Sequence, residues 1–77
     1  MRTVEISSQG VYMLGRQKMS LAQVQDNLLK DSHANRNLVV YIRGDEMGHW
    51  KDVFAVMDFC ARNGIRMSLR GQPPNRR

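Results

Sequence analysis

The alternation of hydrophobic and polar residues predicts two strands at the start of the chain. In "TVEIS" (Thr3–Ser7) apolar residues occupy every second position, which is typical of a strand with one buried face. "SSQG" has the composition of a turn, and "VYML" (Val11–Leu14) is predicted to be a second strand. The two strands are expected to form a hairpin that ends at Gly15. Arg16–Met19 are expected only to cross to the next element.

A first helix is predicted from Ser20 to about Lys30. Ser20 is followed three residues later by Gln23, a spacing typical of a capping box. The apolar positions that follow recur at i, i+3 and i+7: Leu21, Val24 and Leu28. This spacing places them on one side of a helix. The polar segment Asp31–Asn37 is expected to be a loop.

Two further strands and a second helix complete the prediction. Leu38–Arg43 is apolar at successive positions, which favours a central strand covered on both faces. His49–Asn63 has apolar residues at helical spacing, and Gly64 provides a left-handed stop. Ile65–Arg70 alternates, with Ile65, Met67 and Leu69 facing inward.

The predicted fold is an α+β two-layer sandwich with the order β-β-α-β-α-β. Its sheet is expected to be mixed and four-stranded, with both helices on one face, because each helix has a single apolar stripe. The final β-α-β unit should join parallel strands. Residues 1–71 are predicted to form the domain, and residues 72–77 a basic flexible tail.

Composition indicates a small globular domain with a basic surface. The 77 residues are 42% hydrophobic and 25% charged, and a chain of this size buries a modest share of its surface, so oligomerisation would help its stability. No apolar run approaches the roughly 20 residues that span a bilayer. The lone Cys60 is expected to be a small buried hydrophobe. The net charge of +5 is compatible with anionic partners or with a solvated basic terminus.

The acidic loop after the third predicted strand is the main candidate for chemistry. It contains Asp45, Glu46 and His49, and Glu46-x-x-His49 has a spacing that occurs in metal-binding bundles. The only other histidine, His33, lies in a different predicted loop, so too few ligands converge for a metal site. We therefore expect no metal, no cofactor and no enzymatic activity, and interpret the loop as the corner before a helix.

Binding of RNA is an alternative function that suits the basic charge. Proteins that bind single strands stack bases on aromatic side chains displayed on a sheet. Tyr12 and Tyr41 are predicted to share the sheet face away from the helices, with arginines around them. The resulting alternative is a small basic RNA-binding α/β module.

Two long segments together resemble the periplasmic domain of the ExbD/TolR family of biopolymer-transport proteins. The first is "VEISSQGVYMLGRQKMSLAQVQDNLL" and the second is "LVVYIRGDEMGHWKDVFAVMDFCARNGIRMSL". The second is similar to a family pattern of a valine-rich strand ending in Arg-x-Asp, a helix with Val-x-x-Val-Met-Asp, then Gly-Ile and a last strand. The matching positions are Arg43, Asp45, Val53, Val56, Met57, Asp58, Gly64 and Ile65. The resemblance covers about Thr3–Leu69.

The resemblance implies an adaptor domain of a complex driven by the proton motive force. Family members carry one membrane helix that assembles with an ExbB/TolQ-like channel subunit in the bacterial inner membrane. Their periplasmic domain forms a homodimer and contacts a TonB- or TolA-like protein or peptidoglycan. Nutrient uptake and envelope integrity are both compatible with this role.

The last predicted strand is the expected partner or dimer edge. Its outward residues are polar, which suits the edge of a sheet, and an extended segment could add to it as a further strand. An edge that is capped and has no partner is the alternative. The residues predicted to form this site are Ile65, Arg66, Met67, Ser68, Leu69 and Arg70.

Overall fold

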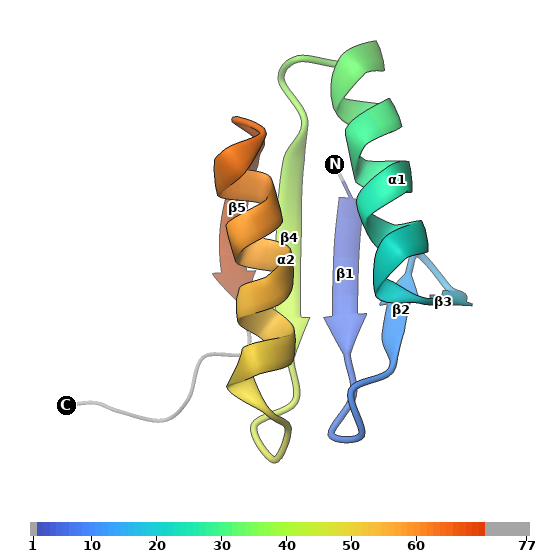
Figure 1. Cartoon of the computed structure of the whole chain (residues 1–77), viewed down its shortest axis with the longest axis vertical. Helices are drawn as coiled ribbons and strands as arrows, with labels where there is room; N and C mark the ends of the chain where they lie inside the picture. Colours follow the sequence, from blue (N-terminus) through green and yellow to red (C-terminus); the bar gives the residue numbers. More distant parts are fainter. Residues whose placement is uncertain (1, 71–77) are drawn as a thin grey trace, which may run out of the picture.

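The computed structural model describes residues 2–70 as one sheet covered by two helices (Figure 1). The predicted tail at residues 72–77 lies outside the described residues. Along the chain the elements are β1 (Arg2–Ile6), β2 (Tyr12–Leu14), β3 (Gln17–Met19), α1 (Leu21–Ala34), β4 (Val39–Gly44), α2 (Trp50–Arg62) and β5 (Arg66–Arg70).

The sheet has five strands in the order β3-β2-β1-β4-β5, so the prediction of four strands was wrong. The strand that was missed is β3, which pairs antiparallel with β2 and matches Gln17 with Leu14. A two-residue turn joins the two strands, and Gly15 takes a positive φ of 66° there. Turns of this length favour such a conformation because it follows the twist of the flanking strands. Gly15 therefore turns the chain back into the sheet.

The remaining strand pairs follow the predicted arrangement. β1 and β2 form the expected antiparallel hairpin. β4 lies between β1 and β5 and is parallel to both, with Val40 opposite Arg2 and Met67. The final β-α-β unit therefore joins parallel strands, as predicted.

Helix α1 starts at the predicted capping box and runs beyond the predicted end. The Ser20 hydroxyl accepts a hydrogen bond from the Gln23 N–H, and the Gln23 side chain accepts one from the Ser20 N–H. The helix continues to Ala34, so the expectation of a loop from Asp31 was wrong. Asp31 forms an ion pair of 2.9 Å with Arg2 of β1. Asp31, Ser32 and His33 have low helix propensity, and the ion pair of Asp31 with a distant segment lies in the last turn that they form.

Helix α2 matches its prediction closely. His49 and Asn63, the predicted ends, are the residues that flank the helix. Gly64 follows with a φ of 66°, which is the left-handed conformation that ends many helices.

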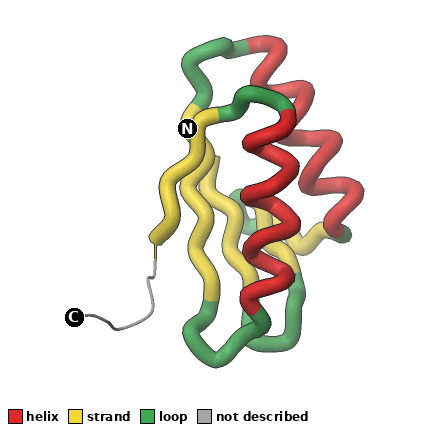
Figure 2. Tube along the Cα trace, turned by 60° about the vertical axis from the view of Figure 1, so that its left-hand side comes forward, coloured by secondary structure: helices red, strands yellow, loops and turns green. Residues whose placement is uncertain are grey.

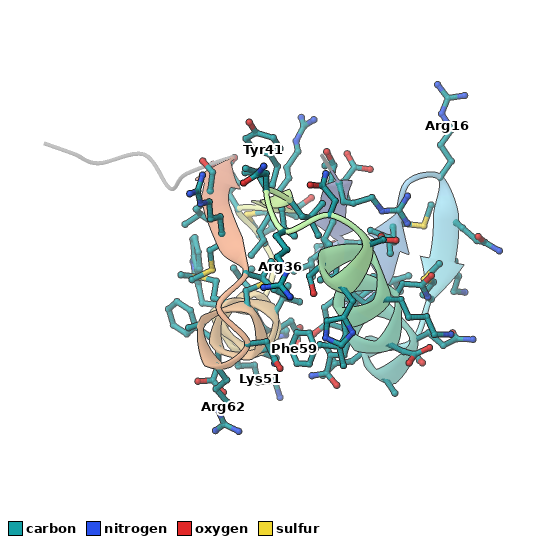
Figure 3. All side chains as sticks on the ribbon, turned by 90° about the horizontal axis from the view of Figure 1, so that it is seen from above. Arg16, Arg36, Tyr41, Lys51, Phe59 and Arg62 are labelled. Atoms are coloured by element: carbon teal, nitrogen blue, oxygen red, sulfur yellow. The ribbon has the colours of Figure 1, made fainter. Side chains whose placement is uncertain are left out.

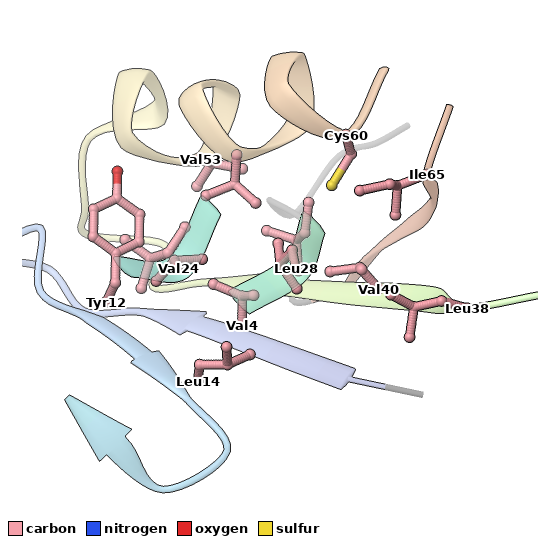
Figure 4. Close-up of a cluster of buried hydrophobic side chains, with 13 residues drawn as sticks. Val4, Tyr12, Leu14, Val24, Leu28, Leu38, Val40, Val53, Cys60 and Ile65 are labelled. Atoms are coloured by element: carbon pink, nitrogen blue, oxygen red, sulfur yellow. The ribbon is translucent and has the colours of Figure 1, made fainter. Parts of the chain in front are cut away.

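The core lies between the sheet and the two helices, which cover the same face as predicted (Figures 1 and 2). Cys60 is fully buried there, as expected. Among residues 2–70 no polar or charged residue belongs to the buried class apart from Tyr12, whose hydroxyl is hydrogen-bonded. Figure 4 shows the cluster of buried side chains: Val4, Ile6, Tyr12, Leu14, Val24, Leu28, Leu38, Val40, Ile42, Val53, Val56, Cys60 and Ile65.

The second face of the sheet has no covering layer among the described residues. On β4, Val40 and Ile42 are fully buried whereas Val39 and Tyr41 are half-buried. Figure 3 shows Tyr41 on the side of the sheet opposite the helices. The expectation that β4 is covered on both faces was therefore wrong. We call this second side the open face.

Candidate functional site

The predicted interaction strand, β5, lies at an edge of the sheet. It pairs on one side with β4 over its whole length, from Arg66 opposite Val39 to Arg70 opposite Arg43. On its other side it has no neighbouring strand among residues 2–70. Its outward backbone N–H and C=O groups therefore form a ready template for another strand. This placement confirms the predicted edge position, while its use by a partner stays a prediction.

The side chains of β5 separate by face. Ile65, immediately before the strand, is buried, and Met67 and Leu69 are half-buried against the core. Arg66 and Ser68 alternate with them and are exposed on the open face. Arg66 forms no ion pair with another described residue. An added strand would therefore meet apolar side chains on one face and a positive charge on the other.

The side of α2 that faces away from α1 carries an apolar strip, which the sequence pattern alone did not distinguish from the core positions of the helix. Figure 3 shows Phe59 between the two helices. Helical geometry places Trp50, Phe54 and Met57 on the opposite flank, toward β5. The rings of Trp50 and Phe54 lie 5.9 Å apart, and Phe54 is 55% exposed.

This strip could have been recognised from the spacing of its residues. The apolar positions of α2 extend beyond the stripe that packs on the sheet, and Trp50, Phe54 and Met57 recur at i, i+4 and i+7. Such spacing defines a second line along a helix. The strip lies beside the edge strand and gives the candidate site an apolar wall.

The other sheet edge is less suited to pairing. β3 has only three residues, and its central residue is the exposed Lys18. Short edge strands and charged side chains both disfavour the addition of another strand. We therefore place the candidate site at β5.

The acidic loop forms a corner, as predicted. The Asp45 carboxylate accepts a hydrogen bond of 2.8 Å from the Met47 N–H, which closes the turn before α2. His49 precedes the helix, and its side chain makes no capping hydrogen bond. Within residues 2–70 no three metal-ligating side chains gather. The second histidine, His33, lies in the last turn of α1, near the other end of the molecule (Figure 1).

The surface beside this corner is a shallow depression of about 750 Å³ on the open face, between the ends of β1 and β4. Its charged side chains include Glu5 and Arg43, whose nitrogen and oxygen lie 3.8 Å apart. The Arg43 side chain is 66% exposed and the Glu5 side chain 48% exposed, so this pair contributes little to stability.

The aromatic platform expected for RNA is not formed. Tyr12 is only 7% exposed and faces the helices, whereas Tyr41 lies on the open face. Tyr12 and Leu14 are two residues apart and point to the same side, a signal that could have predicted the burial of both. The prediction that the two tyrosines share the open face was wrong, and the RNA-binding hypothesis loses its stacking surface.

Comparison with protein families gives a match over most of the chain. The family model described as biopolymer transport protein ExbD/TolR matches residues 2–73. A search of curated proteins found no match. Within the described residues no helix combines the length and the hydrophobicity needed to cross a bilayer. Because the family match covers nearly the whole chain, this protein belongs to the ExbD/TolR family of biopolymer transport proteins.

Proposed function

We propose that this chain is the periplasmic adaptor domain of an inner-membrane complex of the ExbB–ExbD or TolQ–TolR type. Its family is associated with biopolymer transport and with ExbB/TolQ-type partners. In this proposal the proton motive force acts on the membrane part of the complex. The domain transmits the result to a TonB- or TolA-like protein or to peptidoglycan.

The open edge at β5 is the observation that carries the proposal. A partner segment in extended conformation would add next to β5 as a sixth strand. Its backbone would supply affinity through hydrogen bonds. Its successive side chains would lie alternately against the apolar strip of α2, formed by Trp50, Phe54 and Met57, and on the open face beside Arg66. The preferred partner is thus a segment that alternates apolar and acidic residues.

Homodimerisation through the same edge has a different electrostatic signature. Two copies of β5 paired edge to edge would bring the Arg66 side chains of both copies to the open face of one continuous sheet. Like charges on neighbouring strands destabilise pairing, and salt screens them. Added salt should therefore strengthen a β5–β5 dimer and weaken capture of an acidic segment.

Proline substitutions at two successive positions test the edge. The N–H groups of neighbouring strand residues point to opposite sides, so one of Met67 and Ser68 donates toward β4 and the other toward the open edge. Met67→Pro and Ser68→Pro should therefore differ: one breaks the pairing with β4 and loses stability, and the other stays folded. The variant that stays folded, as judged by circular dichroism, should lose binding to the partner segment or the dimer.

Analytical ultracentrifugation and peptide-binding assays read out both functions. If the folded proline variant keeps both its dimerisation and its partner binding, the β5 edge is not the site. The matched control is Lys18→Pro, which places a proline in β3, the strand at the opposite edge of the sheet. This variant should keep both its dimerisation and its partner binding.

A further inference from the structure

The fold brings the ends of several strands and helices together at one end of the molecule. The parallel strands β1, β4 and β5 begin there, and both helices end there (Figure 1). We define the entry pole as residue 2 with residues 31–39 and 59–66. The opposite end is the loop pole, residues 7–11 and 44–53.

The two poles carry opposite charge. The loop pole contains three acidic residues and one lysine: Asp45, Glu46, Asp52 and Lys51. The entry pole contains one acidic residue and four arginines: Asp31, Arg2, Arg36, Arg62 and Arg66. The side chain of His33 lies at the same pole.

Part of this charge has a structural role. Arg2 pairs with Asp31 at 2.9 Å, and Arg62 pairs with Asp58 at 3.0 Å. Arg62 also offsets the partial negative charge of the α2 carboxyl end. Arg36 and Arg66 lie outside the helices, are exposed, and make no ion pair with the described residues. They are the charges of the entry pole that the fold itself does not use.

A hollow of about 430 Å³ at the entry pole lies beside Arg36. Its exposed side chains are those of His33, Arg36 and Asn63, and the buried Leu38 and Ile65 also line it. The polar side chains of Ser32 and Asn63 in the same wall already donate hydrogen bonds to helix carbonyl groups, at 2.8 and 2.9 Å. The cation and the imidazole are therefore the groups available to a ligand, and both suit a phosphate.

We propose that the entry pole rests on an anionic phospholipid surface, with Arg36 and Arg66 contacting headgroup phosphates. The inference rests on the proposed function, in which the domain is held near a membrane. The chain enters the domain at this pole (Figure 1), so an anchor on that side would turn it toward the bilayer. The acidic loop pole would be repelled and point away.

The contact is electrostatic and does not insert side chains into the bilayer. The most exposed large apolar residues of the described chain are Met47, at the loop pole, and Phe54, in the outer flank of α2. Neither belongs to the entry pole. Binding should therefore be reversed completely by salt, because exposed charges are screened within about 8 Å at physiological ionic strength.

Vesicle co-sedimentation of the 77-residue protein tests the inference. Vesicles of phosphatidylcholine with phosphatidylglycerol are compared with vesicles of phosphatidylcholine alone. The test variant is Arg36→Gln with Arg66→Gln. The control is Arg16→Gln with Lys18→Gln, which removes the same charge from the β2–β3 hairpin, away from Arg36 in the view from the entry pole (Figure 3).

The expected result is a large loss for one variant only. Each basic residue at an anionic surface contributes about fivefold in affinity, so the test variant should bind roughly 25-fold more weakly. The control should change by less than about threefold. Equal losses in both variants would show binding by overall charge alone and would overturn the inference. An absence of binding to the phosphatidylglycerol vesicles would also overturn it, as would binding that resists salt.

Two further measurements separate this inference from the proposed function. Arg36→Gln leaves the β5 edge intact and should keep partner binding, while the folded proline variant of β5 should keep vesicle binding. If the Arg36 and Arg66 variant instead loses binding to an acidic polypeptide such as polyglutamate and keeps its vesicle binding, the pole docks a protein and the inference is wrong.

Discussion

The hydroxyl of Tyr12 donates a hydrogen bond of 2.9 Å to the backbone carbonyl of Asp52. This contact joins β2 to the first turn of α2, across forty positions of sequence. It places the tyrosine ring in the core beside the helix and away from the open face (Figure 4).

Tyr12→Phe should lower the free energy of unfolding by about 1 kcal/mol, the typical net value of one such hydrogen bond. The ring stays in place, so no cavity forms. Urea denaturation measures the change. An unchanged midpoint would mean that the hydroxyl bond contributes nothing to stability, and a loss above about 3 kcal/mol would indicate wider repacking.

Stability should fall at alkaline pH partly because of Tyr12. Burial, and then the negative charge of Asp52, raise the pKa of this tyrosine above its ordinary value of 10.0. The unfolded chain therefore loses the proton at lower pH than the folded protein. The contribution of Tyr12 to the free energy of unfolding is therefore complete below about pH 10. It is lost as the pH rises through the pKa that Tyr12 has in the folded protein.

Denaturation midpoints measured between neutral pH and pH 11 check this dependence. Tyr12→Phe should flatten the alkaline fall, and Asp52→Asn should make it shallower. Burial also raises the pKa of the Cys60 thiol, so Cys60→Ala is needed as a separate background. A fall of the same steepness in the wild type and Tyr12→Phe would contradict the assignment.

The Cys60 thiol should be unreactive in the folded protein. Its side chain is fully buried, and burial raises its pKa, so little thiolate is present and reagents cannot reach it. Labelling with a thiol reagent should accelerate as urea unfolds the chain. Ser68→Cys in a Cys60→Ala background is the control, because position 68 is exposed and should react at once. Rapid labelling of native Cys60 would contradict its burial.

Gly44→Ala should destabilise the protein by about 1–3 kcal/mol, as overpacking does. A Cβ atom at position 44 would lie 2.8 Å from Cγ2 of Val53 in α2. The double variant with Val53→Ala should lose less than the sum of the two single changes. Thermal or urea unfolding measures each.

Gly15→Ala is the matched control for this substitution. Gly15 has a positive φ of 66°, and no atom lies within 4 Å of an added Cβ. Its replacement should cost about 1–2 kcal/mol from backbone conformation alone, and no change at Val53 should relieve it. A similar rescue at both glycines would contradict the proposed contact.

The sequence alone determined the features that depend on local spacing. The capping box at Ser20, the stop at Gly64, the central position of β4 and the edge position of β5 all follow from short patterns and were predicted. These signals work because capping, turning and amphipathic burial involve residues that are neighbours along the chain.

The features that depend on pairing between distant segments became visible only in the folded protein. β3 is a strand because Gly15 turns it back onto β2, and α1 extends to Ala34 with Asp31 paired to Arg2. The outward flank of α2 became part of the candidate site only when β5 was placed beneath that helix. Local propensity is weak compared with the free energy of burial and pairing, so spacing along the chain could not show that β3 pairs with β2, that α1 extends to Ala34 or that the second face of the sheet is open.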